Sequence, residues 1–181
     1  MQKIYLKPHK DDSLRRFHPW IFSGAIHHMT AQPEEGELVE IFTAEGQYIA
    51  TGHFQIGSIM VRVLTFDRTP IDQAFYEHRL AVALDVRRSI GLADQQPPAE
   101  SPDSQSANCQ SSDSQSPDCQ FTNAYRLVHG EGDNLPGLVI DIYGTTAVMQ
   151  AHSVGMHVCR GEIAQALRDV AGDRLKAIYY K

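Results

Sequence analysis

The part of the chain that most constrains its fold is residues 125–144, YRLVHGEGDNLPGLVIDIYG. Two apolar runs, at 126–128 and 138–141, flank a loop rich in Gly, Asp, Asn and Pro, and each run is typical of a strand. The glycines permit backbone angles that other residues resist, while Pro136 fixes its own φ. The loop is therefore predicted to be a defined turn that joins two strands.

Two carboxylates in this turn, Glu131 and Asp133, allow two interpretations. A pair of carboxylates can form an acid–base or metal site. Alternatively, they accept hydrogen bonds from the backbone of a tight loop, as Asp and Asn commonly do in turns. The sequence shows no basic partner nearby, so the second interpretation is favoured and no catalytic residue is assigned.

Residues 1–67 have the pattern of a β domain. Short alternating or β-rich runs, separated by glycines, occupy 3–7, 37–43, 47–54 and 58–65. So many short strands in so few residues favour a small barrel or sandwich.

The apolar period changes after residue 68 to that of a helix. Thr69 is expected to be its N-cap, Pro70 its first residue, and Gly91 its C-terminal cap. The apolar stripe of this helix is predicted to consist of Ile71, Phe75, His78, Val82 and Val86.

The C-terminal part continues with strands and one more helix. Strands are predicted at 126–128, 138–141, 146–151 and 177–180. A helix between the last two is indicated by Met156, Cys159, Ile163, Leu167 and Val170, with Gly172 beyond its end. The predicted fold class is α+β, with a small β-barrel over 1–68 and a small α/β domain over 69–181.

Residues 92–121 differ from the rest because they are rich in Ser, Gln, Pro and Asp. They contain a tandem repeat, SPDSQSANCQ followed by SSDSQSPDCQ, in which seven of ten positions are identical. A segment with so few apolar residues is predicted to be a disordered insertion. Its Cys109 and Cys119 could suggest a metal or redox site, but two incidental thiols are the favoured interpretation.

The segment LRRFHPWIFSGAI, residues 14–26, combines arginines with aromatic residues. The chain has a net charge of −6, yet its first 30 residues carry five basic and two acidic side chains, a net +3. Arginine neutralises phosphates, and Trp or His can stack on bases, so the segment indicates RNA binding. The alternative is that Trp20 and Phe22 are core residues and the arginines a solvated edge. The candidate RNA-binding residues are Lys3, Lys7, Lys10, Arg15, Arg16, His18 and Trp20.

Other features of the sequence place limits on its class. His27 and His28 could ligate a metal, but a solvated turn is favoured. No apolar run approaches the roughly 20 residues needed to cross a bilayer, and three cysteines without a C-x-x-C pair favour the cytoplasm.

Three motifs together, RRFHPWIFSGAI, SIMVRVLTFDRTPID and YRLVHGEGDNLPGLVIDIYG, resemble bacterial large-subunit ribosomal RNA methyltransferases of the cytosine-C5 type. The resemblance implies an N-terminal PUA domain, a central α/β domain and a Rossmann-like domain that binds S-adenosylmethionine and lies beyond Lys181. It also implies methyl transfer to cytosine C5 through a cysteine, a role for which Cys109, Cys119 and Cys159 are poor candidates.

On this basis the chain is expected to bind and position ribosomal RNA and to hold no cofactor or metal itself. Two alternatives stay open. One is a non-enzymatic RNA-binding or homodimerisation module. The other is a stand-alone enzyme that uses Glu131 and Asp133.

Overall fold

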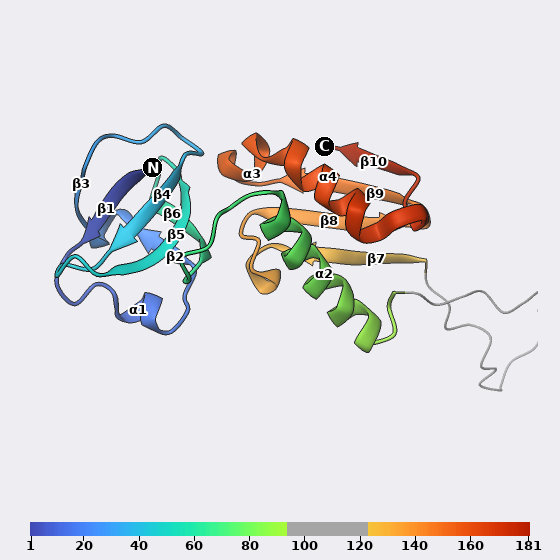
Figure 1. Ribbon diagram of the computed structural model, residues 1–181, viewed down its shortest axis with the longest axis horizontal. Helices are drawn as coiled ribbons and strands as arrows, with labels where there is room; N and C mark the ends of the chain where they lie inside the picture. The colour runs from blue at the N-terminus through green and yellow to red at the C-terminus, as the bar shows by residue number, and fades with distance from the viewer. Residues whose placement is uncertain (94–122) are drawn as a thin grey trace, which may run out of the picture.

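The computed structural model describes residues 1–93 and 123–181, which form two β-sheets side by side along the long axis of the molecule (Figure 1). We call them the N-terminal sheet and the C-terminal sheet. The predicted α+β class is confirmed. The predicted insertion at 92–121, with its repeat, Cys109 and Cys119, lies almost wholly outside the described residues.

The N-terminal sheet has six strands in the order β2-β6-β5-β4-β1-β3. β1 is parallel to β4, and the other pairs are antiparallel. The 3-10 helix η1 (Ser23–Ala25) leads directly from one end of this order to the other, so the sheet is curled into a half-barrel. Its strands are β1 (Gln2–Leu6), β2 (Trp20–Phe22), β3 (Ile26–Met29), β4 (Leu38–Phe42), β5 (Tyr48–Phe54) and β6 (Ile59–Thr65).

The four predicted N-terminal strands are present within one or two residues of their predicted ends. The sequence prediction missed β2, β3 and the one-turn helix α1 (Asp12–Arg15). These elements are too short to establish a period. The inner side of the half-barrel is filled by apolar side chains that include Ile4, Leu6, Leu14, Ile21, Ile41 and Phe54.

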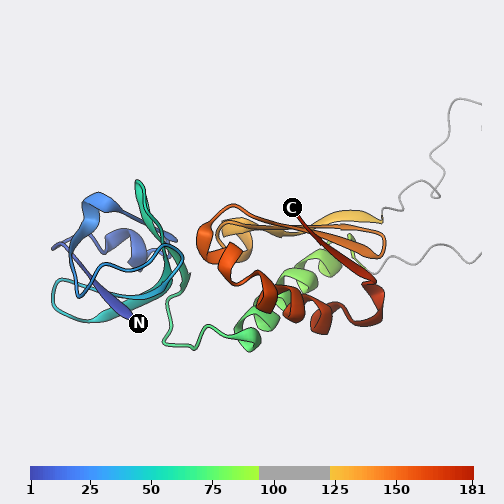
Figure 2. The same ribbon diagram turned by 90° about the horizontal axis from the view of Figure 1, so that it is seen from above.

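The C-terminal sheet has the order β10-β9-β8-β7, with β10 parallel to β9 and the other pairs antiparallel. Its strands are β7 (Ala124–His129), β8 (Leu138–Tyr143), β9 (Thr146–Ala151) and β10 (Ala177–Tyr180), as predicted. Helices α2 (Gln73–Ser89) and α4 (Arg160–Ala171) cover one face of this sheet (Figure 2). The predicted second helix is interrupted at Cys159, which separates α4 from the short α3 (Val154–Val158).

The predicted start of α2 is wrong. Asp72, not Thr69, is the N-cap, since its Oδ1 accepts a hydrogen bond from the Phe75 amide at 3.1 Å. The predicted end is confirmed, because Gly91 has φ +72° and its amide donates to the Arg88 carbonyl at 3.0 Å. Thr69 and Pro70 belong to the link that precedes the helix.

The predicted apolar stripe of α2 is also wrong at three positions. His78, Val82 and Val86 are exposed, whereas the buried residues are Phe75, Tyr76, Leu80, Ala83 and Leu84. Aliphatic residues occur on both sides of this helix, and packing against α4 and β7 selects the side with the larger side chains. Among the described residues, none of the helices is both long and apolar enough to span a bilayer.

Candidate nucleic-acid interface

Exposed aromatic side chains follow α1 at the end of the molecule formed by the N-terminal sheet. Phe17 is 73% exposed, and its φ of +60° is uncommon for a residue other than glycine. Its ring meets the edge of Phe66 at 5.2 Å between centroids. Phe22 on β2 is 48% exposed. The alternative interpretation of Phe22 as a core residue is therefore wrong, because Leu14 and Ile21 supply the core of this segment.

Trp20, the single tryptophan of the chain, is half-buried and held on several sides. Its indole Nε1 donates a hydrogen bond to Oε1 of Glu131 at 2.9 Å. The rings of His18 and Phe22 contact it edge-on, with centroids at 5.7 and 6.4 Å. The backbone amide of Trp20 also donates to Nδ1 of His18 at 3.3 Å. Trp20 thus has one defined orientation, set in part by the C-terminal half of the chain.

The two arginines at this end have different partners. Arg15 Nε donates to Asp11 at 2.7 Å, and this hydrogen bond holds the pKa of the Asp11 carboxyl below its usual range. Arg16 Nε donates only to the Asp12 carbonyl at 3.3 Å and makes no ion pair with any described residue. Arg16 is therefore more readily available to a phosphate, since Asp11 competes for Arg15.

The three lysines predicted for this site are not gathered at one point. Lys7 Nζ donates to the Gly24 carbonyl at 3.0 Å, which connects it with η1. Lys10 is exposed in the turn before α1. Lys3 lies earlier on β1, with its Nζ 5.4 Å from the centre of the Phe42 ring.

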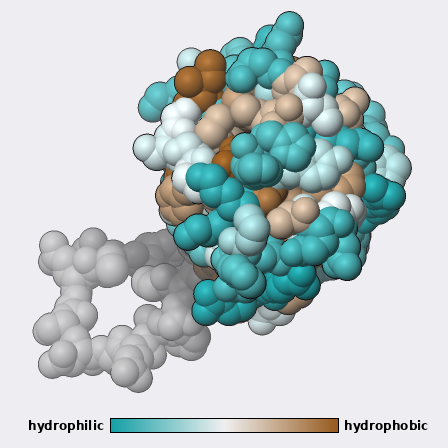
Figure 3. Space-filling view, turned by 90° about the vertical axis from the view of Figure 1, so that its left-hand side faces the viewer, coloured by the Kyte–Doolittle hydropathy of each residue, from teal (hydrophilic) through white to brown (hydrophobic). Residues whose placement is uncertain are grey.

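Figure 3 shows that hydrophilic residues cover most of this end of the molecule, with hydrophobic ones between them.

His53 on β5, which is only 3% exposed, forms another contact between the N-terminal sheet and the C-terminal half of the chain. Burial lowers its pKa to about 4, so the imidazole is neutral near pH 7. Its Nε2 lies 3.8 Å from Sγ of Cys159. The ring packs directly on Gly155, where a Cβ atom would overlap it. Burial raises the pKa of the Cys159 thiol, so this cysteine is not an activated nucleophile.

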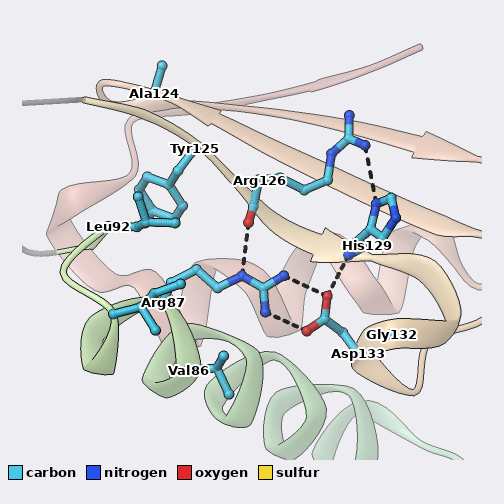
Figure 4. Close-up of a pocket in the computed structure, with 10 residues that line it drawn as sticks. Val86, Arg87, Leu92, Ala124, Tyr125, Arg126, His129, Gly132 and Asp133 are labelled. Atoms are coloured by element: carbon cyan, nitrogen blue, oxygen red, sulfur yellow. Dashed lines mark hydrogen bonds and ion pairs between the residues drawn. The ribbon is translucent and has the colours of Figure 1, made fainter.

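The turn between β7 and β8 contains the 3-10 helix η3 (Gly130–Asp133), which holds both predicted carboxylates. Asp133 accepts the His129 amide at 2.6 Å and binds Arg87 of α2 through both oxygens, one at 2.8 Å (Figure 4). The predicted backbone hydrogen bond is confirmed for Asp133. For Glu131 it is wrong, because the donor is the Trp20 side chain. Arg87 is the basic partner that the sequence did not reveal, since it lies 46 residues away.

A groove of about 710 Å³ lies between the end of α2 and β7 (Figure 4). Its apolar wall includes Val86, Ile90 and Leu92. Its charged groups are satisfied within the protein: Arg87 by Asp133, and Arg126 by Asp141 at 2.7 and 3.1 Å. We therefore interpret the charged side chains of this groove as stabilising the fold and not as a ligand-binding site.

His27 and His28 are exposed, as predicted, but they lie on strand β3 and not in a turn. The His28 ring stacks on Tyr5 at 4.5 Å between centroids. Within residues 1–93 and 123–181, no group of three His, Cys, Asp or Glu side chains could hold a metal ion.

Comparison with known families defines the class of the N-terminal sheet. Residues 4–66 match the PUA-like domain family, so the half-barrel is a PUA-like domain. Over 173 residues, 94% of its length, the chain is 33% identical to ribosomal RNA large subunit methyltransferase I of Klebsiella pneumoniae. It is 31% identical to the protein of that name from Alteromonas mediterranea. The chain spans 37% of the length of each of these relatives.

Solved structures show the same fold. A putative SAM-dependent methyltransferase from Streptococcus mutans superimposes with a TM-score of 0.73 at 16% identity, over 99% of this chain and 41% of that one. A putative methyltransferase complexed with SAH gives a TM-score of 0.72 at 16% identity and is covered over 40% of its length. At these identities the likeness concerns the fold alone.

Proposed function

We propose that this chain is the RNA-binding and positioning part of an S-adenosylmethionine-dependent methyltransferase that acts on cytosine C5 of large-subunit ribosomal RNA. The similarity to ribosomal RNA large subunit methyltransferase I supports the RNA class and the reaction. The observation that carries the proposal is the α1–β2 segment of a PUA-like domain, in which Arg16 and the rings of Phe17 and Phe22 are exposed. Cations and exposed aromatic rings are the groups that bind phosphates and unstacked bases.

In this proposal residues 1–68 bind RNA, and residues 69–181 join them to a catalytic domain outside this sequence. The turn from β9 into α3 is the place where a parallel βαβ unit could receive a nucleotide. That place does not fit S-adenosylmethionine, because His53 packs on Gly155 and Val154 packs against Gly36. We therefore assign no residue of this chain to the cofactor, which supplies the methyl group elsewhere in the protein.

The proposed reaction also requires a cysteine nucleophile, and Cys159 does not suit that role. Cys159 contacts His53 at the junction of the two sheets, and burial raises the pKa of its thiol. A nucleophile needs the thiolate form and access to the base. We propose that the reacting cysteine also belongs to the catalytic domain, and that the residues described here bind and orient the RNA.

The test is binding of protein-free large-subunit ribosomal RNA to the 181-residue chain over a series of salt concentrations. A double variant, Arg15→Ala with Arg16→Ala, is compared with a control, Arg168→Ala with Lys176→Ala, which removes the same charge from exposed positions in the C-terminal half. We expect the first variant to bind at least about 10-fold more weakly. The magnitude of the negative slope of log K against log salt should decrease by about 1. Absent binding at low salt, or equal losses in both variants, contradicts the proposal.

A second candidate function, a dimerisation module, is favoured by one observation. Tyr143 and Tyr179, 56% and 62% exposed, lie on the C-terminal sheet, and β10 is an edge strand of it. Exposed edges and aromatic surfaces favour association. Sedimentation that shows a stable homodimer indifferent to added RNA would support this function over the first. A stand-alone enzyme based on Glu131 and Asp133 is disfavoured, since both carboxylates already bind protein partners.

A further inference from the structure

We infer that Glu131 is a positioning residue that fixes the Trp20 indole, so that the RNA-binding face of the PUA-like domain is set by the C-terminal half of the chain. This inference rests on the proposed function. It explains why the Glu131 carboxylate accepts a hydrogen bond from Trp20, which neither an acid–base site nor a simple turn would require. It also identifies the place at which the two halves of the molecule cooperate in RNA binding.

Trp20 and Glu131 are 111 residues apart in the sequence. The indole of Trp20 has one hydrogen-bond donor, its Nε1–H group. The Trp20 Nε1–H group points at Glu131 Oε1 across 2.9 Å in a partly buried setting. A hydrogen bond to a charged acceptor is stronger than one between neutral groups, and an indole N–H left without an acceptor there would be costly. The bond therefore selects one orientation of the ring, which the edges of His18 and Phe22 then support.

Glu131 can do this because its own turn is rigid. The side chains of Asp133 and Arg87 are only 8% and 12% exposed, and their bidentate pair ties η3 to α2. The His129 amide, which also donates to Asp133, fixes the start of the turn. A continuous series of contacts thus runs from α2 through η3 to β2. The Trp20 ring is held by a part of the fold that does not belong to its own sheet.

The charge of Glu131 argues for a geometric role. A carboxylate beside a face that binds phosphates repels RNA, so electrostatics alone makes Glu131 unfavourable for binding. Its benefit must come from orientation, because a binding-competent ring conformation that is populated only in part weakens the apparent affinity by the same fraction. Loss of the negative charge should therefore strengthen RNA binding, whereas loss of the hydrogen bond to Trp20 should weaken it.

The experiment compares Glu131→Ala with Glu131→Gln in RNA binding. Both variants lose the same charge, but the Gln amide oxygen still accepts from Trp20. We expect Glu131→Gln to bind as well as the wild type or better, and Glu131→Ala to bind about 10-fold more weakly than Glu131→Gln. Glu45→Ala, which removes a negative charge from an exposed turn, is the control and should not weaken binding. Equal affinities for the Ala and Gln variants would overturn the inference.

A double-mutant cycle gives a second criterion. In a Trp20→Phe background there is no indole donor, so Glu131→Ala and Glu131→Gln should bind RNA alike. If the difference between them persists without the indole, Glu131 acts through some other group and the inference is wrong.

A measurement without RNA separates this inference from the proposed function. Trp20 is the only tryptophan of the chain, so tryptophan fluorescence reports on the surroundings of this one indole. In Glu131→Ala we expect emission at longer wavelength and stronger quenching by iodide than in Glu131→Gln. Unchanged quenching would show that Glu131 does not hold the ring, whether or not the chain binds RNA. A changed signal in a chain that fails to bind RNA would contradict the proposed function while leaving the Trp20–Glu131 coupling intact.

Discussion

His53 Nε2 and Cys159 Sγ lie 3.8 Å apart across the junction between the PUA-like domain and the helices of the C-terminal half. The His53 imidazole is buried, neutral and in contact with Gly155. This relationship and the Trp20–Glu131 hydrogen bond join the two halves through specific atoms, in addition to the apolar contact that Leu38 and Leu64 make with the C-terminal core.

The buried His53 predicts a pH dependence of stability. Its pKa is about 4 in the folded state against 6.5 for an ordinary histidine, so below about pH 6.5 the unfolded chain binds a proton that the folded chain does not. The free energy of unfolding should therefore fall by about 2 kcal/mol from pH 7.5 to pH 5, and level off below pH 4 after a total loss of about 3 kcal/mol. Urea unfolding at each pH measures it. A His53→Gln variant should lack this component, and an equal pH slope in both proteins would contradict the assignment.

Gly155 should tolerate no side chain, since a Cβ atom there would overlap the His53 ring. Gly155→Ala is expected to lower the free energy of unfolding by about 1–3 kcal/mol, in the range of overpacked cores. Gly161→Ala is the control, because nothing lies within 4 Å of a Cβ at that position of α4. Part of the loss should be recovered in a Gly155→Ala, His53→Ala double variant; strictly additive effects would mean that the two residues do not meet.

The ion pair between Arg87 and Asp133 should contribute more to the free energy of unfolding than the ion pair between Arg126 and Asp141. Asp133→Asn leaves a guanidinium that is 12% exposed without its charged partner, which is expected to cost about 3 kcal/mol. Asp141→Asn breaks a pair whose Arg126 side chain is 46% exposed, and the expected cost is below about 1 kcal/mol. Urea unfolding compares the two variants, and similar losses would show that burial does not distinguish the pairs.

The N-cap of α2 can be tested directly. Asp72→Ala removes the acceptor of the Phe75 amide and should cost about 1 kcal/mol. Thr69→Ala should have little effect, because Thr69 precedes the helix. Thermal unfolding of both variants checks this, and a larger effect at Thr69 would restore the start of the helix expected from sequence.

Local patterns predicted much of this fold. The strands of the C-terminal sheet and the glycine that ends α2 follow from residues close together in sequence, and the structure confirms them. The start and buried side of α2 could not be predicted in this way. Thr69-Pro70 and Asp72 are both plausible helix starts, and which side of the helix is buried depends on α4 and β7, which the local pattern does not contain.

The candidate site shows the same limit. The basic and aromatic character of residues 14–26 was evident in the sequence, whereas the partners of its side chains were not. Glu131 reaches Trp20 from 111 residues away, and Arg87 reaches Asp133 from 46. Only folding reveals such pairs, because nothing in the composition of either segment specifies the other.

The contacts of Arg87 also have a consequence for the tandem repeat, which lies between α2 and β7 in the sequence. Arg87 Nε donates to the Arg126 carbonyl at 2.9 Å, and its guanidinium binds Asp133, so the last turn of α2 and the start of β7 are fastened together independently of the chain that connects them. Closing a loop that is ten residues longer costs only about 0.3 kcal/mol. The connection between α2 and β7 is thus a place where sequence can be added at little thermodynamic cost, and where an inserted peptide tag or reporter should leave both sheets undisturbed.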